Sequence, residues 1–265
     1  MAEPRVAVIM RCFSRIEDAV INMRYLISAW ASYSYYKLVV CNGDAQGFVY
    51  PAGQGEDEVL RIQTPHGQHH VSGDCALFRA GVERVHALDI PFAVCLTSDT
   101  WLLDEWLLRK YLPVLMAGRY RWISGQWTTP AEAALDFSLL HVPTVMTQKL
   151  FWPPGVSAET WIYQRLQQLD AYARIREIFP VEYPRHLWRP GFDPAGPYHR
   201  DLRVMYFPRA AMVTHHVELL PEGMDSKKRY ANECVGWPIF PGLRPELAQA
   251  RCSTARRRFR MAYHW

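Results

Sequence analysis

The sequence predicts an α/β fold in which helices cover both faces of a mostly parallel central sheet. Arg5–Met10, Lys37–Cys41 and Phe92–Thr97 are short, nearly unbroken apolar runs, as expected of strands that are buried on both faces. Segments with helical spacing separate these strands. Strands that alternate with helices pair in parallel, because each crossover helix returns the chain to the same end of the sheet.

The first helix is indicated by apolar residues that recur every three or four positions from Ile16 to Trp30, so we expect it to reach about Ala31. Ser14 and Glu17 stand in the S-x-x-E pattern of a capping box at its start.

The next elements are a short strand at Val59–Gln63 and a helix at about Ser72–Leu88. Asp104 can cap a helix that reaches about Ala117, and Arg121–Ser124 begins a further strand. The expected order of elements in the first half of the chain is therefore β-α-β-β-α-β-α-β.

The second half carries fewer signals. Thr129–Glu132 forms a second capping box with proline at the first helical position, and Ser157 can cap a helix at about Ala158–Phe179. Two later strands are expected at Val204–Phe207 and Ala211–His215.

Composition narrows the class of protein. The 265 residues are 49% hydrophobic and 21% charged, which is typical of a globular α/β domain with an extension. The net charge of +4 comes from residues 251–265, which hold five arginines and no acid; without them the chain has 25 basic and 26 acidic residues. Such a distribution argues against a nucleic-acid binder, whose basic charge would cover a face.

Targeting signals and cysteine spacing indicate the compartment. No apolar run of about 18 residues and no signal-peptide core occur, and the six cysteines are widely spaced without a C-x-x-C pair. We therefore expect a reducing, cytoplasmic setting.

Polar residues that follow the first two strands are candidates for a ligand site. Arg11 and Arg15 can pair with phosphate, and Ser14 lies at the amide-rich start of the next helix. A solvated loop with an ordinary cap explains them equally well. Asn42 and Asp44 can bind a ribose or a base, although Asn-Gly-Asp is also a common turn.

Two carboxylates stand at other element ends. Asp99, with Ser98, follows the strand at 92–97, where open α/β sheets bind ligands and where a carboxylate can hold a divalent cation or a diphosphate. The alternative is a turn or cap residue. Glu159 lies in the first turn of a predicted helix, a position that the helix dipole alone favours.

Histidines form two groups. The spacing of His66, His69 and His70 matches no standard zinc pattern, and the glycine among them favours a ligand-lining loop. His215 and His216 end a predicted strand, where they can complete a metal's coordination or remain half-buried strand-end side chains.

Taken in order, these segments resemble the GT-A glycosyltransferases, and within them the family 2 type. Members of that family carry a fixed series of segments. The series begins with an arginine- or asparagine-containing loop, an acidic turn and a glycine-containing loop before a helix. It continues with an Asp-x-Asp metal motif, a Glu/Asp motif at a helix start and a strand ending in histidine. The matching segments are Met10–Arg15, Val39–Asp44, His66–Gly81, Thr97–Asp99, Glu159–Leu166 and Tyr206–His215.

The resemblance implies a Rossmann-like GT-A sheet and a metal-dependent, inverting, hexosyltransferase-like enzyme of polysaccharide biosynthesis. Asp99 and His215 would hold Mg²⁺ or Mn²⁺, Glu159 would be the general base, and Trp127 and Trp161 would lie on the acceptor side. The donor nucleotide sugar would contact Arg11, Ser14, Arg15, Asn42, Asp44, His66, Ser98 and Asp99.

The same resemblance implies a division of the chain. A catalytic domain would span residues 1–216, with a nucleotide-binding half at 1–125 and an acceptor-side half at 126–216. Residues 217–265 would be a C-terminal extension.

Two residues depart from the family pattern. Thr97 stands where the first aspartate of the metal motif is expected, and Thr160 follows Glu159 where an aspartate is usual. The alternatives are a nucleotidyltransferase, which Arg11–Arg15 disfavours because it contains no glycine, and a non-catalytic carbohydrate-binding protein on the same fold.

The last ten residues interleave arginines with aromatic side chains. Such a tail can lie on an anionic membrane, which would suit a lipid-linked acceptor; a solvated end is the alternative. We accordingly expect a glycan or lipid-linked acceptor, no nucleic acid, and a cytoplasmic protein with a peripheral contact on the inner face of the membrane.

Overall fold

The computed structural model describes residues 5–42, 49–63, 70–125, 131–153, 155–170, 172–175, 204–207, 210–215 and 221–235. The chain forms two compact units. Unit 1 comprises Met1–Thr100 and Glu105–Arg176, and unit 2 comprises Trp101–Asp104 and Glu177–Trp265. The predicted division at residue 216 is a different partition of the chain and stays a prediction.

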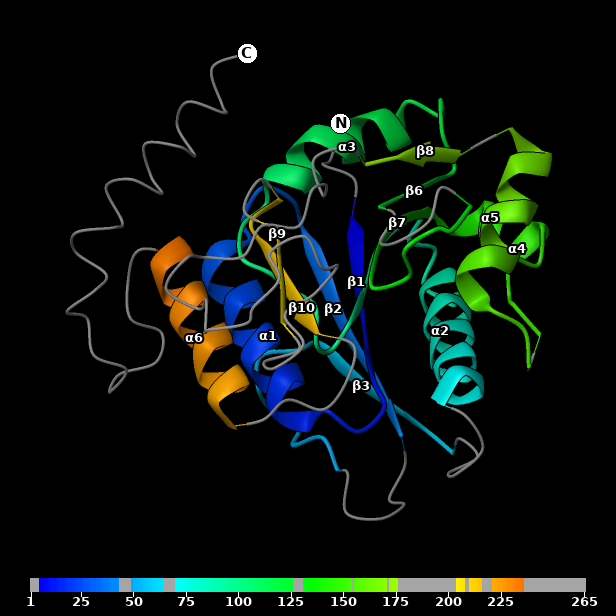
Figure 1. The fold of residues 1–265 in the computed structure, drawn as a ribbon. Helices are drawn as coiled ribbons and strands as arrows, with labels where there is room; N and C mark the ends of the chain where they lie inside the picture. Colours follow the sequence, from blue (N-terminus) through cyan, green and yellow to red (C-terminus); the bar gives the residue numbers. More distant parts are fainter. Residues whose placement is uncertain are drawn as a thin grey trace. The chain divides into compact units, whose positions relative to one another are not determined.

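Unit 1 is built on a seven-stranded sheet with the strand order β3-β2-β1-β4-β7-β6-β8 (Figure 1). All neighbours pair in parallel except β7, which is antiparallel to both β4 and β6. The strands are β1 (Val6–Cys12), β2 (Tyr35–Asn42), β3 (Glu58–Ile62), β4 (Phe92–Thr97), β6 (Trp122–Ser124), β7 (Phe137–His141) and β8 (Tyr172–Arg174).

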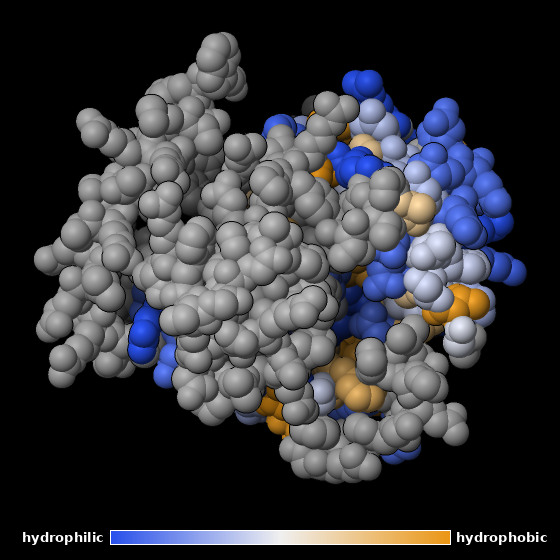
Figure 2. Space-filling model, viewed as in Figure 1, coloured by the Kyte–Doolittle hydropathy of each residue, from blue (hydrophilic) through white to orange (hydrophobic). Residues whose placement is uncertain are grey.

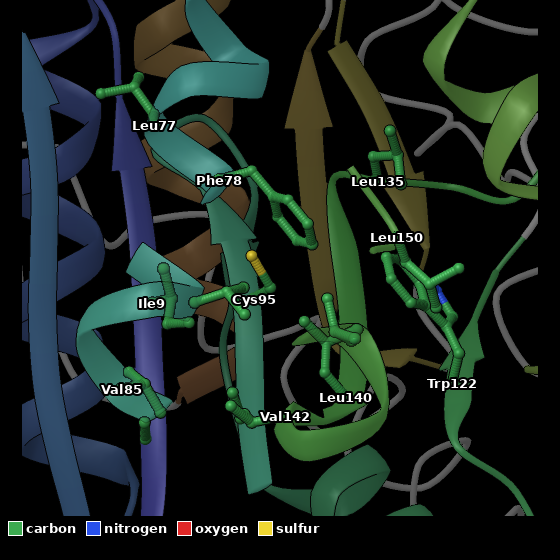
Figure 3. Packing of buried hydrophobic residues seen from close by; sticks show 14 of the residues in the cluster. Ile9, Leu77, Phe78, Val85, Cys95, Trp122, Leu135, Leu140, Val142 and Leu150 are labelled. Atoms are coloured by element: carbon green, nitrogen blue, oxygen red, sulfur yellow. The ribbon is translucent and has the colours of Figure 1, made fainter. Parts of the chain in front are cut away.

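Helices pack against both faces of this sheet, which confirms the predicted fold class. They are α1 (Ile16–Ala29), α2 (His70–Ala87), α3 (Trp106–Met116), α4 (Val142–Thr147) and α5 (Ala158–Leu169). Residues of α2, α4 and α5 join Ala7 and Ile9 of β1 in one hydrophobic cluster (Figure 3). Val8 and Met10, whose side chains alternate with these along β1, are equally buried outside that cluster.

Phe78 of α2 projects into the middle of the cluster, among Cys95, Leu135 and Leu140 (Figure 3). Its ring lies 5.9 Å from that of Trp122 and 5.1 Å from that of Trp152, between ring centroids. Aromatic contacts of this kind bury large areas, so Phe78 contributes strongly to the attachment of α2 to the sheet.

Two glycines let α2 approach its neighbours closely. A Cβ atom added at Gly81 would lie 2.5 Å from Cγ2 of Ile9 and 3.0 Å from Cγ2 of Val40, and one added at Gly73 would lie 2.4 Å from the ring of Phe13. The helix therefore packs directly on β1 and β2 because position 81 carries no side chain.

Unit 2 contains a three-stranded antiparallel sheet with the order β5-β10-β9, formed by β5 (Trp101–Leu102), β9 (Val204–Phe207) and β10 (Met212–His215). It also contains helix α6 (Pro221–Val235). Lys227 of α6 is fully buried, with its Nζ 4.0 Å from the centroid of the Trp101 ring. A cation over an aromatic face is favourable and helps to offset the cost of that burial.

The predicted strands at 5–10, 37–41, 59–63, 92–97, 121–124, 204–207 and 211–215 are confirmed, within one or two residues at their ends. Several elements differ from the predictions. No helix follows the capping box at 129–132: residues 131–136 are irregular and lead into β7. The helix expected to reach Phe179 ends at Leu169, because Asp170 adopts the left-handed conformation with φ 47°. Strands β5, β7 and β8 and helices α4 and α6 were not predicted.

Ser157 is the N-cap of α5, as predicted, although its side chain makes no capping bond. Two other predicted caps are shifted by one residue. Arg15 rather than Ser14 is the N-cap of α1, and Glu105 rather than Asp104 is that of α3; neither makes a side-chain capping bond. The side chain of Glu105 is instead used by the connection after α1, where it accepts hydrogen bonds from Ser32 and Tyr35.

The visible surface of the described residues is mostly hydrophilic, with a few scattered hydrophobic groups (Figure 2). Ile27 and Val49 are large hydrophobic residues that are about half exposed. Within the described part of the chain, no helix has the length and hydrophobicity needed to cross a membrane.

Candidate functional site

The candidate site lies at the carboxyl ends of β1 and β4. These strands are parallel neighbours, with Arg11 opposite Thr97, and the chain leaves them toward opposite edges of the sheet. The amide of Ser98 donates a hydrogen bond to the carbonyl of Arg11 at 2.8 Å, which joins the loops that follow the two strands. A reversal of strand order of this kind opens a crevice in α/β sheets, where ligands bind.

Arg15 and Asp99, which follow these two strands, form an ion pair through Nη1 and Oδ2. Asp99 is only 8% exposed. The hydroxyl of Thr97 lies 2.9 Å from that of Thr100, so the turn that carries Asp99 is closed by a side-chain hydrogen bond. The two residues predicted to bind phosphate and metal thus meet in the structure.

Arg11 has different surroundings, because its side chain is buried beside the hydrophobic cluster that contains Phe78. The residue is 2% exposed; Nη1 pairs with Asp74 of α2 and Nη2 donates to the carbonyl of Leu135. Its guanidinium carbon lies 5.7 Å from the centroid of the Phe78 ring. Burial by itself would lower the pKa of Arg11, but Asp74 and Asp136 raise it overall, so the guanidinium stays charged.

The end of β2 contributes Asn42 to the same edge. Asn42 is almost fully buried, and its Nδ2 donates to the carbonyl of Phe13 at 3.3 Å. Ser14, the next residue in that loop, is half-buried and its carbonyl accepts from the amide of Ile16. Asn42 is therefore bonded directly to the loop after β1, at Phe13, which precedes the predicted donor contact Ser14.

Glu159 lies in the first turn of α5, where it is half-buried. Burial raises its pKa, and the negative charges of Asp136, Asp74 and Glu132 raise it further, against a backbone hydrogen bond that lowers it. Asp74 and Asp136 are also the carboxylates that act on Arg11. Arg11 and Glu159, which are 148 positions apart by their numbers, therefore share the same two acidic neighbours.

Asp74 and Asp136 are the site residues that sequence reasoning missed. Asp74 belongs to a predicted helix, where an acidic residue near the start is ordinary, and Asp136 stood in a segment predicted to be helical. The sequence held one indication that such acidic residues exist. Arg11 directly follows an apolar strand, and an arginine that is buried there requires an acidic partner.

The predicted acceptor-side aromatics are only partly described. Trp161 packs against the hydrophobic cluster, and the guanidinium carbon of Arg165 lies over its ring, 5.9 Å from the ring centroid. Trp127 lies outside the described residues, as do Asp44, His66, His216 and the basic tail at 251–265.

The metal-binding prediction involves Asp99 and His215. Carboxylate oxygen is the ligand that Mg²⁺ prefers, and Asp99 offers one such group. His215 is buried at the end of β10 in unit 2, so its predicted role with Asp99 stays a prediction. Among the described residues, no group of three or more His, Cys, Asp or Glu side chains is arranged to hold a metal ion.

Several solved structures are similar to part of this chain. A cytidylyltransferase from Leptospira borgpetersenii is 10% identical over 65% of this chain and 77% of its own, with a TM-score of 0.46. A mannosyltransferase from Pyrobaculum calidifontis, solved with GDP-Man and Mn²⁺, is 12% identical over 61% of this chain and 51% of its own, with a TM-score of 0.44.

A glycosyltransferase from Streptococcus pneumoniae is 11% identical over 66% of this chain and 46% of its own, with a TM-score of 0.41. No family model and no curated protein match the sequence. Because these TM-scores are below 0.5, the function proposed below rests on the residues and strand order of this chain.

Proposed function

We propose that this protein is a glycosyltransferase that moves a sugar from a nucleotide-sugar donor to an acceptor hydroxyl, with inversion at the anomeric carbon. One observation carries the proposal. A cationic side chain and an acidic one, Arg15 and Asp99, meet at the β1–β4 switch point, while Glu159 shares its acidic neighbours with Arg11 on the same strand end.

The donor would bind at the ends of β1, β2 and β4. Arg15 would pair with the diphosphate through its guanidinium fork. Ser14 and Asn42, at the ends of β1 and β2, would contact the donor beside it, and Asp44 and His66 are proposed as further donor contacts. Asp99 is the described residue that would hold a divalent cation, with His215 proposed as a second ligand. Bound Mg²⁺ or Mn²⁺ would supply charge neutralisation at the leaving nucleoside diphosphate.

Glu159 would act as the general base. Its carboxylate accepts the proton from the acceptor hydroxyl as the hydroxyl oxygen forms a bond to the anomeric carbon. The bond from that carbon to the diphosphate oxygen breaks at the same time, on the opposite face of the sugar. A raised pKa suits this task, because a base with a higher pKa holds the transferred proton more firmly.

The acceptor side would be formed by Trp161 and Trp127, whose rings can stack on a sugar. A glycan or a lipid-linked sugar would present the hydroxyl that Glu159 deprotonates. A hexosyl donor is the proposed substrate class, and polysaccharide synthesis the proposed process.

A thermal-shift screen tests the proposal. UDP-, GDP-, dTDP- and CMP-sugars are each added with and without Mn²⁺, and one nucleotide class is expected to raise the melting temperature, more so with metal. Arg15→Gln should lose most of this shift, whereas Arg79→Gln, which changes an exposed arginine of α2, should keep it.

Failure of every donor to stabilise the wild-type protein would count against the proposal. Release of pyrophosphate from a nucleoside triphosphate and a sugar phosphate would instead identify a nucleotidyltransferase. Binding of free glycan with no response to any nucleotide would identify a carbohydrate-binding protein.

A further inference from the structure

Arg11 is the most thoroughly buried charge at the candidate site. Its guanidinium uses Nη1 for Asp74 and Nη2 for the carbonyl of Leu135, and its side chain is 1% exposed. The side chain of Arg15, by contrast, is 23% exposed. To reach a diphosphate, Arg11 would have to give up an ion pair and a hydrogen bond inside the protein, which is costly for a buried charge.

The carbonyl that Arg11 binds belongs to a short segment, Ala133–Asp136, with no regular secondary structure. Five hydrogen bonds hold this 133–136 segment, two of which are at Ala134: its amide donates to the carbonyl of Gly125 at 3.0 Å, and its carbonyl accepts from the hydroxyl of Ser138 at 3.0 Å. The other three join the segment to the site. The amide of Thr97 donates to the carbonyl of Asp136 at 3.1 Å, Arg11 binds Leu135, and the amide of Ala133 donates to the carbonyl of Glu159 at 3.2 Å.

We infer that Arg11 is a positioning residue for Glu159: it fixes the 133–136 segment and Asp74, and through them the location and charge environment of the proposed base. The inference rests on the proposed function only in naming Glu159 as the base. In this role Arg11 does not contact the donor phosphate, although the sequence predicts that contact.

The mechanical part of this role runs through backbone bonds. Arg11 joins β1 to the 133–136 segment, and Ala133 of that segment is bonded to the first turn of α5. A lysine at position 11 keeps the charge, but its single ammonium group cannot reproduce the fork that reaches both Asp74 and Leu135.

The electrostatic part follows from the shared neighbours. Asp74, Asp136 and Glu132 all act on Glu159 in the direction of a higher pKa, and Arg11 is the buried cation that faces the first two. Removing the guanidinium would leave these carboxylates uncompensated and raise the pKa of Glu159 further. Removing the negative charge of Asp74 would instead lower the pKa of Glu159.

Three variants test the role in the full-length protein: Arg11→Gln, Asp74→Asn and, as a matched control, Arg15→Gln. The titration of the Glu159 carboxyl is followed by ¹³C NMR and assigned with Glu159→Gln, so this readout needs no sugar transfer. The Kd of the nucleoside diphosphate and the separate kcat and KM values complete the set.

Arg11→Gln should raise the pKa of Glu159 and lower kcat about 10- to 100-fold, with the Kd of the nucleoside diphosphate unchanged. Asp74→Asn should lower that pKa. Arg15→Gln should weaken the nucleotide and leave the titration of Glu159 where it is. If Arg11→Gln fails to fold, Arg11→Lys takes its place: the retained charge should hold the titration of Glu159 near its wild-type position, while the lost fork to Asp74 and Leu135 should still lower kcat.

An unmoved Glu159 titration in Asp74→Asn, or a loss of nucleotide binding in Arg11→Gln as large as in Arg15→Gln, would overturn the inference. If the wild-type protein transfers no sugar, the proposed function fails while the titration still tests Arg11. If it transfers sugar and the titration does not move, only the inference fails.

Discussion

Glu159 is the residue on which the proposed chemistry depends. Its half-buried carboxyl lies among other acidic groups, and the resulting pKa is above the ordinary value of 4.5. A base must be ionised to accept a proton, so the rate should rise with pH through this raised pKa rather than near 4.5.

Glu159→Gln should lower kcat about 100- to 10,000-fold, because the amide cannot accept the proton, with donor affinity retained. The measurement is the pH profile of kcat/KM in wild type and variant, and the rising limb of the wild type should vanish in the variant. Unchanged turnover with intact donor binding would remove Glu159 from the mechanism.

Glu105 shows how one residue secures the scaffold. Although it is the N-cap residue of α3, its side chain is directed to the connection between α1 and β2. Its carboxylate accepts from the amide of Ser32 at 2.8 Å and from the hydroxyl of Tyr35 at 2.6 Å. Burial by itself would raise the pKa of Glu105, but its hydrogen bonds lower it overall.

Glu105→Gln should lower the free energy of unfolding by about 1.5–3 kcal/mol, the range for hydrogen bonds to a charged group. Because the folded-state pKa is lowered, this stability is present above the ordinary value of 4.5 and is lost as the pH falls through the lowered pKa. Urea unfolding between pH 3 and pH 7 should therefore show a weaker pH dependence in the variant. Glu83→Gln, at an exposed pair with Arg79, is the control and should change little.

At the scale of elements, α2 is the helix that brings Asp74 to the site. Its approach to β1 and β2 depends on Gly81, where a side chain would meet Ile9 and Val40. In most helices Gly→Ala is stabilising, because alanine loses less backbone entropy on folding. At Gly81 the close contact should make the same substitution destabilising.

Gly81→Ala should lower the free energy of unfolding by about 1–3 kcal/mol through overpacking. Gly73→Ala provides the comparison: its new methyl group meets only the partly exposed ring of Phe13, which can move, so the loss should be smaller. Denaturant unfolding of both variants measures this, and equal stabilisation of the two would contradict the packing of α2.

The elements that sequence patterns misjudged share a physical cause. Residues 137–140 of β7 are buried in the sheet between β4 and β6, so they have no alternation to mark a strand. The helix at 158 looked longer because the residues after Leu169 keep helical spacing, whereas Asp170 in the left-handed conformation ends it and pairing with β6 extends the next residues. Long-range pairing decided both cases.

At the scale of the whole molecule, the chain separates into the unit with the seven-stranded sheet and the unit with α6 and the small sheet. The arginine-rich tail at 251–265 belongs to the second unit by sequence and lies outside the described residues. Its composition makes it a candidate for contact with an anionic membrane.

Deletion of residues 251–265 should abolish binding to vesicles that contain phosphatidylserine and leave the nucleotide-dependent thermal shift intact. Five arginines at about 1 kcal/mol each give the tail enough attraction for a peripheral contact, which should weaken with salt. Vesicle co-sedimentation is the measurement, with neutral phosphatidylcholine vesicles as the control. Equal binding by the truncated protein would place any membrane contact elsewhere.

The sequence by itself determined the strands β1, β2 and β4, the helices between them and the polar residues at their ends, because each of these depends on local patterns of apolar and polar residues. Only the tertiary structure decided that Arg15 meets Asp99, that Arg11 is withdrawn to Asp74 and Leu135, and that Glu159 lies among the same carboxylates as Arg11. Arg11 and the carbonyl that it binds at Leu135 are 124 positions apart, and only the packing of strands and helices brings such groups together, so no local pattern contains them.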